Sequence, residues 1–203
     1  VDPGSLDGTA AAVRRAFGRN RKVLLVSYGL NRGKGYALRT GLREFLRMKG
    51  DALVTLDADR QHDPSQIPVV SELVRSGASD IVIGSRFSKR ESEYPRTRDF
   101  FNILVNLVML LTSGSFFADV SSGYRCYSAA AVRAVLPRLS IDDFGVEPEI
   151  LKFAAAAKLR IATVPVTCEY QSGKKPNFSR LAGGYLRFAM KYKNDIIKRV
   201  FKL

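Results

Sequence analysis

Two aspartates, Asp57 and Asp59, directly follow the apolar run at residues 52–56. A short apolar run bounded by polar residues predicts a strand buried on both faces, and open α/β sheets bind ligands beyond the carboxyl ends of their strands. Gln61 and His62 follow within the same short segment. Such an oxygen-rich set suits Mg²⁺ or Mn²⁺ bridging a diphosphate better than it suits zinc. The position after a strand therefore favours a divalent-metal site.

The competing interpretation of this segment is a polar turn that closes the strand. We keep that interpretation for Asp63, which precedes a proline at the start of the next predicted helix, and reject it for Asp57 and Asp59. His62 is the one histidine of the chain and is a candidate ligand or base. Beside this turn we interpret it instead as a supporting residue.

Residues 31–35 combine two glycines with two cations, Arg32 and Lys34, ahead of a helical pattern. Glycine lets the backbone approach a ligand closely, and the N-terminus of a helix favours anions. The spacing matches neither a Walker loop nor a dinucleotide fingerprint. Two hypotheses stay open: an anion-binding turn, and a plain helix start.

The elements that must position these residues alternate between strand and helix. Strands are predicted at residues 23–26, 52–56 and 80–84, and helices at residues 34–48 and 65–74. This order predicts parallel pairing with right-handed crossovers. We therefore expect an α/β fold with a mostly parallel central sheet flanked by helices.

The second half of the chain departs from this alternation. Residues 88–98 predict a surface loop, residues 100–111 and 144–157 predict helices, residues 160–170 predict an edge strand, and residues 116–127 are ambiguous. No internal repeat or low-complexity linker interrupts the chain. We expect one domain over residues 1–173.

The tail at residues 174–203 has a different character, with nine basic residues and one acidic residue, Asp195. Apolar and aromatic residues recur at helical spacing on one side, and basic residues lie on the other. The pattern predicts a basic amphipathic helix, which suits an anionic membrane surface. A helix packed on the core with a solvated basic face is the alternative and the commoner arrangement.

The charge of the whole chain limits its partners. Among 203 residues, 33 Lys and Arg against 19 Asp and Glu give a net charge of +14, which predicts attraction to anions. We expect no nucleic-acid partner, because no recognition motif is present and the basic residues gather in the tail. Two isolated cysteines, the lack of a secretory signal and the lack of a spanning apolar segment predict a cytoplasmic protein, peripheral at the membrane.

Taken in order, six segments resemble the family 2 glycosyltransferases of the GT-A fold. Within that family the likeness is closest to the dolichol-phosphate mannose synthases and related polyprenyl-phosphate sugar synthases. The segments read VDPGSLDGT, NRGKG, DADRQHDP, IGSR, DVSSGYR and VPV, at residues 1–9, 31–35, 57–64, 83–86, 119–125 and 164–166. No single motif is decisive, but all six occur in the expected order and the likeness covers nearly the whole chain.

The resemblance implies metal-dependent, inverting transfer of a sugar such as mannose or glucose. The donor is a nucleotide-sugar, and the acceptor is a polyprenyl (dolichyl) phosphate at the cytoplasmic membrane face. By this likeness Asp57, Asp59 and Gln61 hold Mg²⁺ or Mn²⁺ on the donor diphosphate. Asp2, near the nucleotide base or ribose, and Lys34 belong to the same donor side.

On the acceptor side, the resemblance implies that Arg86 and Arg98 grip the phosphate, with Asn102 beside them. Asp119 and Ser122 lie on the same side. Asp59, Arg86, Arg98 and Asp119 are the residues to which we assign catalysis.

The chemistry of a phosphate acceptor agrees with these arginines. A phosphate monoester has a second pKa near ~6, so at neutral pH it is already a nucleophile and needs positioning more than a base. The alternative acceptor, a saccharide hydroxyl, needs a general base. Asp119, Asp143 and Glu147 are the candidates for that role.

Three departures accompany the resemblance. The family has a further strand and helix before the segment that begins at Val1, so we expect the domain to be truncated at its N-terminus. Pro3 stands where a second acidic residue is usual, and residues 171–175 replace an arginine-containing loop. Lys174 and Arg180 are the available substitutes for that arginine. An inactive remnant of such an enzyme is the remaining alternative.

Overall fold

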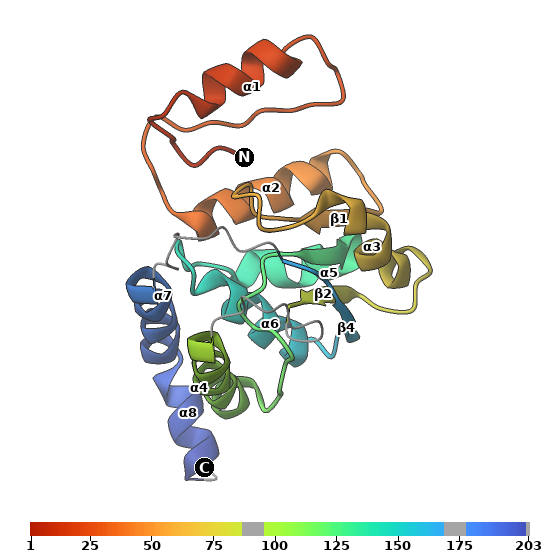
Figure 1. Cartoon of the computed structure of the whole chain (residues 1–203). Helices are drawn as coiled ribbons and strands as arrows, with labels where there is room; N and C mark the ends of the chain where they lie inside the picture. The colour runs from red at the N-terminus through yellow and green to blue at the C-terminus, as the bar shows by residue number, and fades with distance from the viewer. Residues whose placement is uncertain (87–95, 169–177, 202–203) are drawn as a thin grey trace.

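The computed structural model describes residues 1–86, 96–168 and 178–201, and within these the side chains of residues 96–101 and 178 are not described. A four-stranded sheet lies at its centre among the helices (Figure 1). The strands lie in the order β1 (Ala52–Thr55), β3 (Arg125–Ser128), β2 (Ile81–Ser85), β4 (Ile161–Pro165). The α/β class expected from the sequence is confirmed.

The sheet is mixed. β3 runs antiparallel to both of its neighbours, β1 and β2, and only β2 and β4 pair in parallel. The expectation of a mostly parallel sheet is corrected on this point. The cause is β3, which begins inside the segment that the sequence pattern left ambiguous and inserts between the two earlier strands.

Helices cover both faces of the sheet. Successive side chains of β2 point alternately to one face and to the other. Ile81 packs with residues of α2 (Lys34–Arg47), α5 (Ala129–Val135) and α6 (Val146–Ala156). Val82 points to the opposite face, where it packs against Val70 and Val74 of α3 (Ile67–Arg75). Because side chains alternate along a strand, one fully buried strand serves both cores.

The shorter elements agree with the sequence pattern. A 3₁₀ turn, η1 (Pro64–Gln66), leads into α3, and together they form the helix expected at residues 65–74. A second 3₁₀ turn, η2 (Leu136–Arg138), follows α5. The loop predicted at residues 88–98 lies mainly outside the described residues.

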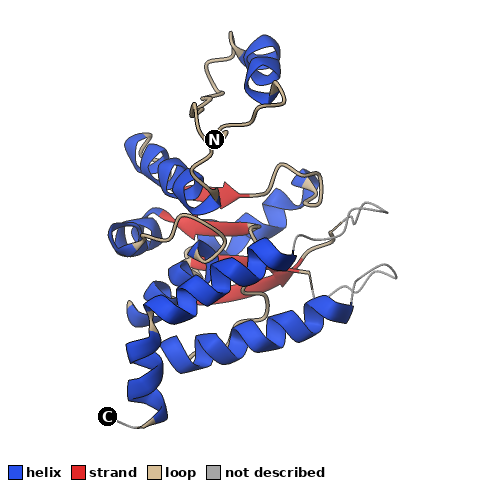
Figure 2. Cartoon of the chain, turned by 90° about the vertical axis from the view of Figure 1, so that its left-hand side faces the viewer, coloured by secondary structure: helices blue, strands red, loops and turns tan. Residues whose placement is uncertain are grey.

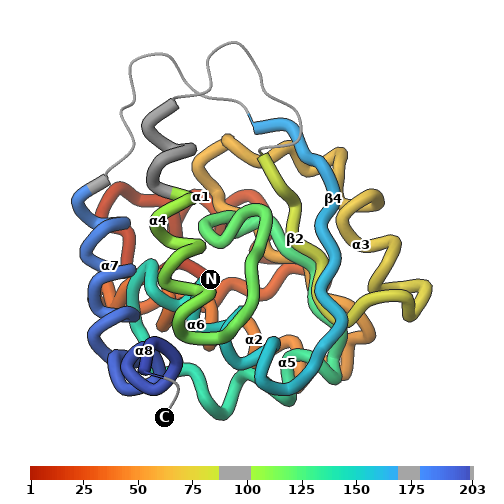
Figure 3. Tube along the Cα trace, turned by 90° about the horizontal axis from the view of Figure 1, so that it is seen from below, coloured from red at the N-terminus to blue at the C-terminus, as the bar shows by residue number. Residues whose placement is uncertain are grey.

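Three helices form one side of the molecule. α4 (Arg96–Ser113) and α7 (Phe178–Lys191) lie side by side, and α8 (Lys193–Val200) contacts α4 (Figures 2 and 3). Arg199 of α8 lies against the end of α4, since a Cβ added at Gly114 would stand 2.5 Å from its guanidinium.

The tail forms two helices instead of the single one expected, with the break at Tyr192. The hydroxyl of Tyr192 donates to the buried carboxylate of Glu149 at 2.7 Å, and the ammonium of Lys191 donates to it at 2.8 Å. Tyr185 and Phe188 are buried in the core. The start of the tail helices is therefore packed on the domain, while their outer side is exposed.

The N-terminal segment projects from this body and carries α1 (Thr9–Phe17), which buries no residue (Figure 1). The prediction of a strand at residues 23–26 was wrong. Only an isolated parallel bridge joins Asp2 to Ser27, and Val23 and Leu24 are exposed. The apolar run has no strand ladder to join among the described residues, so its pattern alone does not make it a strand.

Candidate active site

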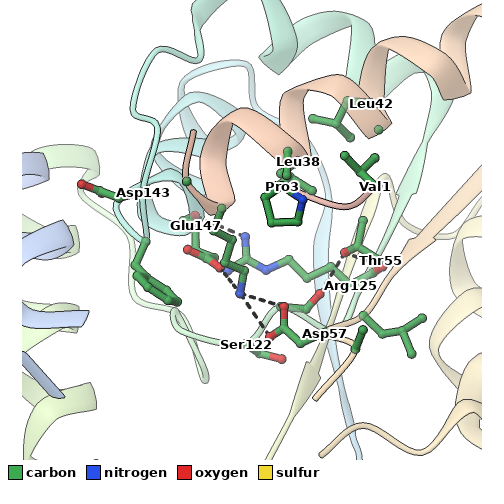
Figure 4. A pocket seen from close by; sticks show the side chains of 18 of the residues that line it. Val1, Pro3, Leu38, Leu42, Thr55, Asp57, Ser122, Arg125, Asp143 and Glu147 are labelled. Carbon is green, nitrogen blue, oxygen red and sulfur yellow. Dashed lines mark hydrogen bonds and ion pairs between the residues drawn. The ribbon is translucent and has the colours of Figure 1, made fainter. Parts of the chain in front are cut away.

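A pocket of about 820 Å³ opens beyond the carboxyl end of β1 (Figure 4). Its walls come from the first half of α2 as far as Leu42, β1 and the residues that follow it, the turn at Ser122 and Gly123, and the start of α6. Val1 and Pro3 line the same pocket from the N-terminal segment, and Arg180 and Arg187 line it from α7. Segments far apart in the sequence therefore meet at the place where open α/β sheets bind ligands.

An ammonium group between two carboxylates lies at the centre of this pocket. The Lys34 Nζ atom lies 3.0 Å from Oδ1 and 3.1 Å from Oδ2 of Asp57, and 2.7 Å from Oε1 of Glu147 (Figure 4). Each residue comes from a different element: Lys34 begins α2, Asp57 follows β1, and Glu147 lies in the first turn of α6. The group carries two negative charges and one positive charge.

The ion pairs shift the protonation equilibria of this group. Burial lowers the pKa of Lys34, but the carboxylates of Glu147 and Asp57 outweigh burial and raise that pKa. Burial raises the pKa of Asp57, but the ammonium of Lys34 outweighs it and lowers that pKa. Both groups are therefore charged at neutral pH.

Glycines bring the backbone close to this group. A Cβ added at Gly123 would lie 2.8 Å from the carboxylate of Asp57, so only glycine allows the carboxylate to rest on this turn. A Cβ at Gly35 would lie 2.2 Å from the carbonyl oxygen of Ile141. A larger residue would therefore displace the carboxylate of Asp57 at position 123 and would shift the backbone at position 35.

The structure shows how residues 31–35 lead into α2. The backbone N–H groups of Gly35 and Tyr36 donate to the carbonyl oxygen of Asp142, and that of Gly33 donates to the side chain of Asn31. These bonds hold the start of α2 on a neighbouring loop. Asn31, Gly33 and Lys34 of this segment line the pocket.

The turn after β1 holds the predicted metal ligands. The N–H of Gln61 donates to Oδ1 of Asp59 at 3.0 Å, with Arg60 between them at a φ of 67°. The N–H of Asp57 donates to Nδ1 of His62 at 3.1 Å. His62 is buried, which lowers its pKa, so it supports the turn as expected.

The donor chemistry of this turn fits a hard cation. Asp59 is exposed, Asp57 is half-buried, and Gln61 adds an amide oxygen. Mg²⁺ and Mn²⁺ take one or two carboxylates together with substrate phosphates. Among the described side chains, no three His, Cys, Asp or Glu residues are close enough to hold a metal ion by themselves. A metal ion at this turn would therefore need further ligands from outside the protein, such as water or phosphate oxygens.

A second polar cluster surrounds Arg86. Its Nε and Nη2 donate to the two carboxylate oxygens of Asp119, each at 2.8 Å, and Asp119 is fully buried. Burial raises the pKa of Asp119, but Arg86 outweighs it and lowers that pKa. Asp119 therefore acts as a fixed anion that orients the guanidinium.

The other acceptor-side candidates have different positions. The hydroxyl of Ser122 is buried and donates to the carbonyl oxygen of Gly84 at 2.7 Å, so it holds a turn. The amide of Asn102 donates to the carbonyl oxygen of Ala118 at 3.0 Å. Arg98 lies in α4, but its side chain is outside the described residues.

Asp2 is buried but does not line the pocket, although its neighbours Val1 and Pro3 do. Its carboxylate accepts hydrogen bonds from the N–H of Ser5 at 3.0 Å and the hydroxyl of Ser27 at 2.8 Å. Hydrogen bonds from the side chains of Ser5 and Ser27 are the main cause that lowers the pKa of Asp2 to about 2. In this structure Asp2 holds the N-terminal turn together.

Two arginines of the pocket were missed by the sequence interpretation. Arg125 is 1% exposed and donates to the carbonyl oxygens of Glu147 and Val120, at 3.2 and 2.7 Å. Arg187 of α7 was counted only as part of the basic face of the tail. A basic residue inside the buried strand β3 was the available signal for Arg125, and no local signal marked Arg187.

Comparison with known proteins places this geometry in a family. Residues 1–136 match the family model described as glycosyl transferase family 2. The chain is 30% identical over 188 residues to an undecaprenyl-phosphate mannosyltransferase of Micrococcus luteus, across 91% of this chain and 75% of that protein. It is 24% identical over 202 residues to a dolichyl-phosphate beta-glucosyltransferase of Trichomonas vaginalis, across 98% of this chain and 59% of that protein.

A third relative is a UDP-N-acetylglucosamine–dolichyl-phosphate N-acetylglucosaminyltransferase of Methanococcus voltae. It is 31% identical over 151 residues, across 73% of this chain and 60% of that protein. The chain therefore spans between 59% and 75% of the length of these three relatives.

Solved structures show the same fold. Mannosyl-3-phosphoglycerate synthase from Rubrobacter xylanophilus superposes with a TM-score of 0.66 at 21% identity, over 94% of this chain and 61% of that one. Glucosyl-3-phosphoglycerate synthase from Mycobacterium tuberculosis, in complex with Mn²⁺ and UDP-glucose, superposes with a TM-score of 0.61 at 17% identity, over 96% of this chain and 66% of that one. The GT-A-like fold is thereby confirmed, and the chain belongs to glycosyltransferase family 2.

Proposed function

We propose that the protein transfers a hexose, mannose or glucose, from a nucleotide-sugar to a polyprenyl (dolichyl) phosphate with inversion at the anomeric carbon. The observation that carries this proposal is the charged group of Lys34, Asp57 and Glu147 in a pocket beyond β1, beside the Arg86–Asp119 pair. Membership of the family supports the proposal, and so do the activities for which the Micrococcus and Trichomonas relatives are named.

The donor side of the proposal rests on the turn after β1. Asp57, Asp59 and Gln61 would hold Mg²⁺ or Mn²⁺, which when bound neutralises the charge that develops on a departing diphosphate. The Mycobacterium structure with Mn²⁺ and UDP-glucose is consistent with this cofactor. Lys34 fixes the carboxylate of Asp57, so the turn is oriented before the donor binds.

The acceptor side rests on Arg86. Asp119 holds its guanidinium from one edge, and the charge of Arg86 is close enough to lower the pKa of Asp57 after the larger effects of burial and Lys34. A phosphate acceptor held by such an arginine lies next to the donor site. The acceptor oxygen then attacks the anomeric carbon directly, and this single displacement inverts it.

The state of the candidate bases favours a phosphate over a saccharide hydroxyl. Asp119 pairs with Arg86, Asp143 with Arg187, and Glu147 with Lys34. A carboxylate in an ion pair offers its oxygens to the cation and not to a substrate hydroxyl. A phosphate acceptor needs no base, since it is already ionised at neutral pH.

We propose further that the protein works as a peripheral protein on the cytoplasmic, anionic face of a membrane. Within the described ranges, no helix is long and apolar enough to cross a bilayer. α4, α7 and α8 instead expose apolar side chains on their outer sides, namely Ile103, Leu104, Leu107, Leu110, Leu186, Met190, Ile197 and Val200. Lys193, Lys198 and Arg199 are exposed on the same group of helices, as anionic headgroups require.

Sugar transfer to the two acceptor classes tests the proposal. Purified protein with Mn²⁺ and GDP-mannose or UDP-glucose is expected to glycosylate a polyprenyl phosphate and to leave a saccharide acceptor unmodified. Arg86→Lys keeps the charge beside buried Asp119 but loses the planar fork. This variant is expected to raise the KM for the lipid phosphate about tenfold and to leave the donor KM unchanged.

Arg160→Lys is the matched control, because Arg160 also pairs through Nε and Nη2 with one aspartate, Asp80, and does not line the pocket. Its KM values are expected to equal those of the unaltered protein. Transfer to the saccharide with none to the lipid phosphate would overturn the proposed acceptor.

A further inference from the structure

Arg187 is held at the edge of the pocket by Asp143. Its Nε donates to Oδ2 of Asp143, while Oδ1 of the same carboxylate accepts the N–H of Gly145 at 2.9 Å. Asp143 is therefore fixed to the backbone at the start of α6. In Figure 4 its side chain points away from the Lys34 group, so it holds Arg187 without competing for Lys34.

Two glycines of α7 set the path of this arginine. A Cβ added at Gly183 would lie 3.6–4.0 Å from the guanidinium of Arg187, so the side chain lies back along its own helix. A Cβ added at Gly184 would lie 2.8 Å from the backbone nitrogen of Gly145. Since α7 touches the start of α6 at this point, the position of Arg187 beside the pocket is fixed by close backbone packing.

The guanidinium of Arg187 is used differently from those of Arg86 and Arg160. Arg86 and Arg160 each engage a carboxylate with both Nε and Nη2. Arg187 engages Asp143 through Nε within the described contacts, and its side chain is 60% exposed. Its two amino groups make no contact among those described, and Arg187 lines the pocket. A phosphate in the pocket could therefore accept the paired hydrogen bonds that these groups offer.

Two of the other pocket cations, Lys34 and Arg125, have less capacity for a new anion. Lys34 already faces two carboxylates, and Arg125 is buried with two of its nitrogens on backbone carbonyls. A phosphate entering the pocket also meets the negative charges of Asp57 and Glu147. An exposed cation at the rim would offset that repulsion.

We propose that Arg187 binds a phosphate group of a substrate in this pocket through its amino groups, and that Asp143 is its positioning residue. The inference rests on the proposed function, since it assumes a phosphate-bearing substrate. Two sources share that chemistry: the diphosphate of the donor and the phosphate of the lipid acceptor.

Binding measurements separate these sources. The full chain is titrated with UDP or GDP plus Mn²⁺, with the matching nucleoside, and with a short-chain water-soluble isoprenyl phosphate. Arg187→Gln is expected to weaken one or both phosphate ligands about tenfold and to leave the nucleoside affinity unchanged. Loss for the nucleotide alone assigns the donor diphosphate, and loss for the isoprenyl phosphate alone assigns the acceptor.

Two further variants test the positioning. Compared with Arg187→Gln, Arg187→Lys is expected to recover part of the phosphate affinity, because it restores the positive charge but not the planar set of donors. Asp143→Asn keeps the acceptor for the Gly145 N–H and is expected to weaken phosphate binding about threefold. Arg160→Gln, equally exposed at 58% and paired with Asp80, is the matched control and is expected to change no affinity.

The inference is overturned if Arg187→Gln leaves both phosphate affinities within twofold, or weakens the nucleoside as much as the nucleotide. In the first case the ion pair only attaches α7 to α6, and sugar transfer by the unaltered protein would still support the proposed function. If the unaltered protein binds neither phosphate ligand, both the inference and the proposed function fail.

Discussion

At the scale of single residues, the site depends on charges that only the fold brings together. Lys34 meets Glu147 across 113 positions of sequence, and the pair is 2.7 Å apart with Glu147 3% exposed. An unpaired carboxylate at such a place is costly, because burial disfavours its charge. The lysine is therefore a structural counter-ion as well as a part of the donor pocket.

Lys34→Met is expected to lower the free energy of unfolding by about 2–4 kcal/mol, since it leaves the buried Glu147 without its cation. Adding Glu147→Gln to this variant is expected to recover more than half of the loss, because the uncompensated charge is then removed. Urea unfolding of the two variants measures both values. If Lys34→Met is as stable as the unaltered protein, the role of Lys34 as counter-ion of Glu147 is contradicted.

The Arg86–Asp119 pair predicts a dependence of stability on pH. The pKa of Asp119 is lowered in the folded state, so its contribution is present above about pH 4, the ordinary carboxyl value, and is lost as the pH falls through the lower, folded-state pKa. Asp119→Asn is expected to cost about 3–5 kcal/mol at pH 7. This difference from the unaltered protein is expected to narrow as the pH falls below about 4.

Urea unfolding at pH 7 and in steps below pH 4 measures this difference. Asp80→Asn is the control, because its partner Arg160 is exposed and the pair is expected to contribute at most about 1 kcal/mol. If Asp119→Asn lowers the free energy of unfolding at pH 7 by no more than Asp80→Asn does, the role of the buried pair is contradicted.

The sequence predicted the residues of the site better than their contacts. The prediction that Asp57 and Lys34 serve a ligand site is consistent with their place in the pocket, since strand ends and helix starts carry a local signal. The sequence around Arg125 and Arg187 contains no local signal that distinguishes a pocket arginine from a structural or solvent-exposed one. Their positions follow from the insertion of β3 and from the packing of α7 on α6.

At the scale of elements, α2 is held by the approach of its first turn to residues 141–142. The N–H of Gly35 donates to the carbonyl oxygen of Asp142 at 2.7 Å, and the guanidinium of Arg39 donates to that of Ile141 at 2.7 Å. This contact sets the place of Lys34 relative to α6. A shift of α2 would therefore disturb the pocket.

Gly35→Ala is expected to destabilise the protein by about 2 kcal/mol or more, because its Cβ would stand 2.2 Å from a backbone oxygen. Gly41→Ala in the same helix meets only the side chain of Val1 at 3.7 Å. It is expected to stabilise α2 by about 0.5–1 kcal/mol through helix propensity. Thermal or urea unfolding compares the two, and equal effects would contradict the close approach.

Helices were predictable where the apolar period was long, and strands only where they were also paired. The patterns at residues 34–48 and 144–157 correspond to α2 and α6. The run at residues 23–26 has the composition of a buried strand, but strand formation depends on a partner that the local pattern does not contain. β3 has four residues, too few for its alternation to be distinguished.

At the scale of the whole molecule, α4 and α8 lie at the opposite end from α1 (Figure 1). Both helices expose apolar side chains. Leu107 of α4 is 52% exposed, and Leu24 of the N-terminal segment is 58% exposed. The two leucines therefore lie in different parts of the molecule but have similar exposed fractions.

Leu107→Ser is expected to weaken binding to vesicles containing anionic lipid about fivefold, because less apolar surface is buried in the interface. Leu24→Ser is the matched control and is expected to leave binding unchanged. Sedimentation with vesicles at low and high salt measures both, and salt is expected to weaken binding of all variants. Equal binding by the two variants would contradict docking through α4.

The most direct test of the account is the rate of Mn²⁺-dependent sugar transfer to a polyprenyl phosphate by Asp59→Ala. Asp59 is exposed and accepts only the N–H of Gln61 within the described contacts, so the variant is expected to unfold at the same temperature as the unaltered protein. Asp63→Ala, which removes the cap of η1 in the same segment, is the control. The account predicts a loss of at least about 100-fold for Asp59→Ala and near-normal transfer for Asp63→Ala. Undiminished transfer by Asp59→Ala would contradict the metal site.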